Sequence, residues 1–111
     1  MWRGPSKYHA RKTTVDGITF DSRREADRYI VLKGMEEDGA IRDLRRQVRY
    51  ELIPPFDVDS RHYRPVFYVA DFVYVEDGKE IVEDVKGMRT DVYRLKSKLF
   101  ARRYGKAIKE T

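Results

Sequence analysis

Two aspartates and a lysine, Asp71, Asp84 and Lys86, are the residues of this chain whose types and spacing best fit a chemical role. They lie in two runs rich in β-branched and aromatic residues, and Asp77-Gly78 separates the runs. An Asp-Gly pair between such runs is the strongest short-range signal for a β-hairpin. A two-residue turn at this pair places Asp71 directly opposite Asp84, so the sequence predicts two facing carboxylates.

The same hairpin predicts which side chains share a face of the sheet. Because side chains alternate along a strand, Asp84 and Lys86 share one face and Glu83 points to the other. The register also places Lys86 opposite Val69. Two like charges facing each other repel, and a divalent cation removes that repulsion. Hard cations such as Mg²⁺ take carboxylate oxygens, and a neighbouring lysine can orient or activate a water.

Length and composition set the limits of this interpretation. The 111 residues predict one domain over 13–111, preceded by a flexible basic arm over 1–12. There is no cysteine and only two histidines, so we expect any metal to be held by oxygen. Neither a membrane-span pattern nor a signal-peptide pattern is present, so we expect a soluble intracellular protein with no membrane partner.

The charge is unevenly distributed. The net charge is +5, but residues 50–85 hold 3 Lys/Arg and 9 Asp/Glu, a net charge of −6. Residues 1–49 hold 12 and 8, and residues 86–111 hold 9 and 2, so both flanks are basic. An acidic centre between basic flanks is typical of a metal cluster that acts on a polyanion, although a solvated charged surface explains the same counts.

The rest of the pattern predicts an α/β (α+β) fold with a central mixed sheet flanked by helices. In chain order we expect a hairpin over 13–20, a helix from Ser22 to about Asp38, a strand over 41–53 with an irregular start, a loop over 56–65, the two strands of the Asp77-Gly78 hairpin, a turn over 87–90, a helix over 91–104 and a short strand at 107–108. The caps are Ser22 and Gly39 for the first helix and Thr90 and Gly105 for the second. The apolar residues of the second helix, Val92, Leu95 and Leu99, have helical spacing.

Glu25 has two interpretations. It lies three residues after Ser22 and completes a capping box, which would explain it by local structure alone. On a helical wheel, however, it lies between Tyr29 and Leu32 on the inward, apolar side. An acidic residue on that side needs a partner, so a metal or catalytic role is the alternative.

Two groups of basic residues are candidates for contacts with nucleic acid. The second helix carries a basic face that can bind phosphates by counterion release, and the strand over 41–53 carries a second cluster beside Gln47. Both groups are also explained as solvated surface, and Gln47 as an exposed polar residue. The candidate nucleic-acid-binding residues are Arg45, Arg46, Gln47, Arg94, Lys96, Lys98 and Arg102.

Asp71 together with the Asp84-x-Lys86 spacing resembles the core motif of the PD-(D/E)XK nuclease superfamily. The departure is Ala70, where many members carry a proline that has no chemical role. Over residues 7–111 the chain is similar to small phage-encoded endonuclease or Holliday junction resolvase-like domains of this superfamily. The segments that carry the resemblance are 15–22, 70–72, 83–87 and 96–100.

The resemblance implies a restriction-endonuclease-like core and an Mg²⁺- or Mn²⁺-dependent DNA endonuclease, with Glu25, Asp71, Asp84 and the Val85 carbonyl as metal ligands and Lys86 as a catalytic residue. Several branches of the superfamily supply such a glutamate from their first helix. Branched DNA is the expected substrate, a homodimer the expected assembly, and the cytoplasm of a bacterium or phage-infected host the expected location, with no small-molecule cofactor. The alternatives are a nicking or restriction-like nuclease on duplex DNA and a non-catalytic nucleic-acid-binding module.

Overall fold

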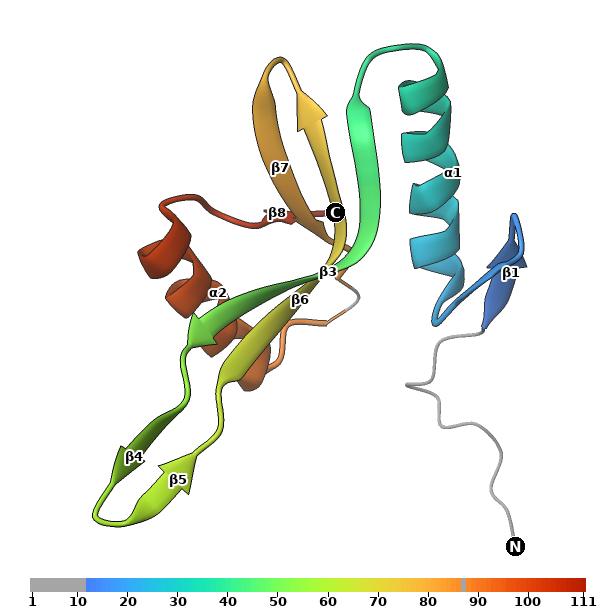
Figure 1. Cartoon of the computed structure of the whole chain (residues 1–111). Coiled ribbons are helices and arrows are strands. Elements are labelled where there is room, and N and C mark those ends of the chain that lie inside the picture. Colours follow the sequence, from blue (N-terminus) through green and yellow to red (C-terminus); the bar gives the residue numbers. More distant parts are fainter. Residues whose placement is uncertain (1–11, 87) are drawn as a thin grey trace, which may run out of the picture.

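The structure, a computed structural model, describes residues 12–86 and 88–111 (Figure 1). Its elements are β1 (Thr13–Val15), β2 (Ile18–Phe20), α1 (Arg23–Glu37), β3 (Arg42–Ile53), β4 (Phe56–Val58), β5 (Arg61–Tyr63), β6 (Val66–Glu76), β7 (Lys79–Asp84), α2 (Asp91–Tyr104) and β8 (Lys109–Glu110). The predicted basic arm lies outside the described residues except for Lys12, as does Gly87 of the predicted turn.

A four-stranded mixed sheet forms the centre of the fold, in the order β3-β6-β7-β8. The pairs β3–β6 and β6–β7 are antiparallel, and β7–β8 is parallel. The hairpins β1–β2 and β4–β5 are separate two-stranded sheets. The predicted α/β (α+β) class with a mixed central sheet and two helices is therefore confirmed.

Local sequence signals set the ends of both helices. The Ser22 hydroxyl accepts the Glu25 N–H at 3.0 Å, and the Thr90 hydroxyl accepts the Tyr93 N–H at 3.0 Å. Gly105 ends α2 in the left-handed region at φ 69°, a conformation that favours glycine. The predicted N-caps and the stop of the second helix are confirmed.

The two helices pack on different parts of the sheet (Figure 1). One buried cluster joins α1 to Phe72 and Tyr74, and the other joins α2 to Tyr68 and Ala70. In an uninterrupted strand these four alternate residues would share one face. The alternating side chains of β6 therefore point to the α2 side of the sheet up to Ala70 and to the α1 side from Phe72, and the change occurs at Asp71.

The segment 56–65 was predicted to be a loop, and this was wrong. It contains the β4–β5 hairpin, with Asp59 and Ser60 both at positive φ in its turn. Phe56 and Tyr63 face each other across it, with ring centroids 4.8 Å apart. The hairpin projects away from the sheet and both helices (Figure 1).

Of the three apolar residues of α2 that have helical spacing, Leu99 packs against the buried cluster, but Val92 and Leu95 do not. Val92 and Leu95 are 63% and 58% exposed, whereas Tyr93 and Phe100 are buried. The reason is aromatic packing: the Phe100 ring contacts Tyr50 and Tyr68 edge-on, at centroid distances of 5.1 and 5.7 Å.

The last strand begins two residues later than predicted, at Lys109, because Lys109 and Glu110 are the residues that pair with β7. Ile108, which was predicted to lie in the strand, packs in the α2 cluster instead. In the described residues, no helix is long and apolar enough to cross a membrane.

Candidate active site

The β6–β7 hairpin has the register that the Asp77-Gly78 turn predicts. Its pairs run from Glu76↔Lys79 to Phe72↔Glu83, and one step further along the same register Asp71 is opposite Asp84. The pKa of Asp71 is raised to about 7, mainly by burial and also by the nearby carboxylates of Asp84 and Glu25, against a lowering by the Val85 N–H. That N–H donates to Asp71 Oδ2 at 2.8 Å. Three acidic side chains from α1, β6 and β7 thus affect one another electrostatically.

Asp84 is buried and held from two sides. The Tyr68 hydroxyl donates to its Oδ2 at 2.6 Å, and Lys86 Nζ lies 2.9 Å from its Oδ1. Burial and the bond to Asp84 raise the pKa of Tyr68 well above its ordinary range, so this phenol remains a donor. Sequence reasoning missed Tyr68 because alternation places it and Asp71 on opposite faces.

Lys86 reaches Asp84 by a different route from the one predicted. Strand β7 ends at Asp84, so Lys86 does not pair with Val69. The Lys86 N–H donates to the Thr111 carbonyl at 3.1 Å, because the segment after β7 separates from β6 and runs beside the segment after β8. Its ammonium lies 4.0 Å from the centre of the Tyr93 ring, a favourable cation–π contact. Tyr93 and Asp84 together fix the position of the ammonium.

Glu25 is 7% exposed and lies on the inward side of α1, as predicted. Its backbone N–H is capped by Ser22, while its carboxylate Oε2 accepts a hydrogen bond from Gln47 Nε2 at 3.3 Å. Burial raises the pKa of Glu25, and the positive charge of Arg46 opposes this effect. The side chain therefore extends toward β3, beyond what capping requires.

Gln47 marks an interruption between β3 and β6. The ladder pairs Arg46 with Phe72 and Val48 with Ala70, so Gln47 lies opposite Asp71. Its φ is 52°, an uncommon value for a residue that is not glycine, and such strain is frequent at functional sites. The interruption coincides with the change of face at Asp71, and nothing in the local sequence signals it.

The acidic side chains of this site suit a hard cation chemically, because Glu25, Asp71 and Asp84 offer carboxylate oxygens. In the described residues, no three His, Cys, Asp or Glu side chains are arranged to hold a metal ion. Tyr68 and Lys86 contact both oxygens of Asp84, and at Val85 the contact with Asp71 is made by the N–H rather than the carbonyl. The carboxylates are close together but are held by protein donors.

The candidate nucleic-acid-binding residues differ in how they are held. Arg45 pairs with Glu80 at 3.1 Å, and Arg46 lies over the Phe20 ring at 4.6 Å with its Nε buried and without a hydrogen-bond partner in the structure. On α2, the four candidate residues form no ion pair with any other described residue, whereas Arg103 of the same helix lies 3.5 Å from Glu51 Oε1; three of the four are exposed. These four are Arg94, Lys96, Lys98 and Arg102.

Comparison with known proteins gives a family but no function. No curated protein and no solved structure matches the chain. One family model matches residues 5–111, which is nearly the whole chain. The chain belongs to this family, whose description is "Protein of unknown function (DUF1064)".

Proposed function

We propose that this protein is a metal-dependent DNA endonuclease of the PD-(D/E)XK type that hydrolyses phosphodiester bonds. The observation that carries the proposal is that Asp71 and Asp84 are opposite each other on β6 and β7, near enough to Glu25 for the three charges to affect one another, with the Lys86 ammonium 2.9 Å from Asp84. Buried carboxylates that repel one another lower stability unless a cation or a proton neutralises them. An acidic cluster of this kind has no use in a protein that only binds DNA, because it repels phosphates.

The residues that would hold the cation are Asp71 and Asp84, with Glu25 from α1 and the Val85 carbonyl as further ligands. A bound Mg²⁺ or Mn²⁺ would polarise the phosphate and lower the pKa of a coordinated water. Asp71, with a pKa of about 7, is partly protonated near neutral pH and would release its proton when it becomes a ligand.

Lys86 and Tyr68 would act on either side of the carboxylates. The Lys86 ammonium is held by Asp84 and by the face of Tyr93, where it would orient the attacking water or stabilise negative charge that develops on the phosphate. Tyr68 fixes the orientation of Asp84 through its 2.6 Å hydrogen bond and is a positioning residue. Gln47 is likewise a positioning residue for Glu25, because its Nε2 donates a hydrogen bond to the Glu25 carboxylate.

A labelled four-way junction, the matching duplex and a single strand, each incubated with Mg²⁺, Mn²⁺ or EDTA, test the proposal. We expect cleavage that EDTA abolishes and that Asp84→Asn or Lys86→Ala lowers by a factor of at least about 100. Asp77→Asn in the exposed hairpin turn makes the same chemical change as the first variant, away from the site, and should keep full activity. Unchanged cleavage by either site variant would refute the assignment.

The same cleavage experiment tests the substrate preference, and analytical ultracentrifugation tests the assembly. We propose a homodimer that prefers branched DNA, because two active sites related by a two-fold axis suit a junction that needs two matched cuts. A monomer by analytical ultracentrifugation that cuts junction and duplex equally would indicate the nicking or restriction-like alternative. DNA binding without cleavage under any metal condition would indicate the non-catalytic binding module.

A further inference from the structure

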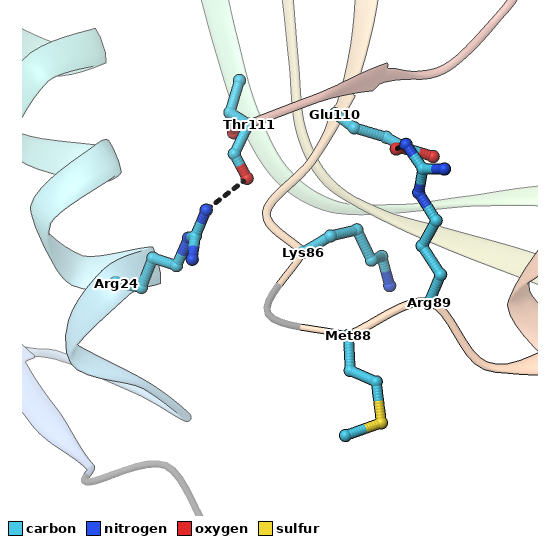
Figure 2. A pocket seen from close by; sticks show the side chains of 6 residues that line it. All are labelled: Arg24, Lys86, Met88, Arg89, Glu110 and Thr111. Carbon is cyan, nitrogen blue, oxygen red and sulfur yellow. Dashed lines mark hydrogen bonds and ion pairs between the residues drawn. The ribbon is translucent and has the colours of Figure 1, made fainter.

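A cavity of about 300 Å³ lies beside the candidate active site. Residues from α1, from the segment after β7 and from the end of the chain line it (Figure 2). These residues are Arg24, Lys86, Met88, Arg89, Glu110 and Thr111. Lys86 belongs to both places, because its ammonium contacts Asp84 while its side chain lines the cavity. Whatever occupies the cavity therefore lies next to the carboxylates.

Three of the lining side chains are cationic. Figure 2 shows Arg24 on one side and Arg89, whose guanidinium lies beside Glu110, on the other, with Lys86 and Met88 between them. Arg24 Nη2 donates to the Thr111 carbonyl at 3.4 Å, and Arg89 Nη2 lies 2.6 Å from Glu110 Oε1. A guanidinium has five N–H donors, so these contacts hold each arginine in place and leave most of its donors available for a ligand.

Glu110, the one acidic side chain of the lining, is already occupied. Its Oε2 accepts the Tyr93 hydroxyl at 2.8 Å and its Oε1 receives Arg89. The hydrogen bond from Tyr93, supported by Arg89, holds the pKa of Glu110 below its ordinary value. Glu110 therefore anchors Arg89 at the rim, and the surface offered to a ligand is mainly positive.

The chemistry of the lining is that of a nucleotide site. Arginine forks match the oxygens of a phosphate group, and two of them on opposite walls can hold one phosphate between them. Met88 is 61% exposed and presents a polarizable thioether against which a base or sugar can pack. The volume is at the lower end of the range for ligand pockets, enough for one nucleotide.

We propose that this cavity, the Arg24–Arg89 pocket, binds one nucleotide of the DNA strand, next to the phosphodiester at the carboxylates. The nucleotide's phosphate lies between Arg24 and Arg89, and its base or sugar packs on Met88. The identification of the ligand as part of a DNA strand rests on the proposed function.

Titration of the full chain with thymidine 5′-monophosphate in EDTA tests the pocket without any cleavage. NMR signals of the arginine Nε–H groups report the binding, and thymidine, which has no phosphate, is the parallel ligand. We expect the monophosphate to shift the Arg24 and Arg89 signals, and Arg24→Ala or Arg89→Ala to weaken binding about 5- to 10-fold. Arg23→Ala is the matched control, because Arg23 is the exposed neighbour of Arg24 on α1 and does not line the cavity.

The outcomes separate the pocket from the nuclease. Monophosphate binding that is absent, that thymidine reproduces, or that both pocket variants leave unchanged would overturn the pocket, even if metal-dependent cleavage is found. Binding that depends on both arginines, in a protein that cleaves no DNA, would support a nucleotide site and reject the proposed nuclease. Both arginines lie at the surface, and a thermal melt shows whether each variant is folded.

Discussion

Replacement of Asp71 by asparagine should stabilise the metal-free protein, and the gain should grow as the pH rises. In the folded chain the pKa of Asp71 is about 7, against an ordinary value of 3.8, and burial is the main cause. Below the ordinary pKa the side chain is protonated in both states and contributes nothing. Between the two values the unfolded chain releases the proton while the folded chain keeps it, so stability falls. Above about pH 7 the loss is complete.

The size of the effect follows from the pKa difference. At 1.36 kcal/mol per pKa unit, a difference of about three units corresponds to roughly 4 kcal/mol at high pH. Asp71 remains partly exposed, so solvent screens the repulsion, and we expect about 1–3 kcal/mol. Asparagine resembles the protonated acid and can still accept the Val85 N–H, so the substitution removes the charge with little change in shape.

Thermal or urea unfolding of wild type and Asp71→Asn in EDTA, at several values between pH 5 and pH 8, measures this prediction. The advantage of the variant should increase by about 1–2 kcal/mol over that range, or about 4–12 °C in the melting temperature. Asp77→Asn makes the same change at the exposed end of the hairpin and should show no such increase. A constant or falling advantage for Asp71→Asn would show that the carboxylate is not held in a repulsive, buried setting.

Two further substitutions test single residues. Glu83→Gln should destabilise the fold by about 2–4 kcal/mol in urea unfolding, because the Glu83 carboxylate is fully buried and accepts two hydrogen bonds from Arg28, at 2.6 and 2.9 Å. The control is Glu80→Gln, which removes the charge from an exposed ion pair and should cost less than about 1 kcal/mol. Glu25→Gln should lower the rate of DNA cleavage by a factor of at least about 100, with little change in the free energy of unfolding, because glutamine also serves in a capping box but cannot supply the charge of a metal ligand. Near-normal cleavage would show that Glu25 has only the structural role of a capping residue.

Much of the fold was predictable because its signals are local. Both Asp-Gly pairs form the expected turns, and at each pair the aspartate and the glycine have positive φ. Each N-cap hydroxyl accepts the backbone N–H three residues later, as the sequence predicts. Glu83 was expected on the face opposite Asp84, and it pairs there with Arg28 from α1. Each of these features depends on residues close in sequence or on a single strand alternation.

One error comes from a weak turn signal, and the other from contacts between segments that helical periodicity does not reveal. A two-stranded hairpin at 56–63 has little stability on its own, and its turn residues, Asp59 and Ser60, are a weaker signal than Asp-Gly. The buried face of α2 was misread because aliphatic spacing was given more weight than aromatic size. Tyr93 and Phe100 are buried because each ring finds a partner, in Lys86 and in Tyr50, that helical periodicity does not reveal.

The candidate site depends on an irregularity that no local pattern predicts. In a regular strand Tyr68 and Asp71 point to opposite faces, and Tyr68 cannot reach the carboxylate opposite Asp71. The interruption at Gln47 and Asp71 changes the face, so that Tyr68 bonds Asp84 while Gln47 bonds Glu25. A residue that is not glycine at φ 52° raises the free energy of the fold, and two hydrogen bonds to carboxylates of the cluster offset that cost. The motif predicts that Asp71 and Asp84 are opposite each other, but the interruption of the β3–β6 ladder at Gln47 determines which donors orient the acids.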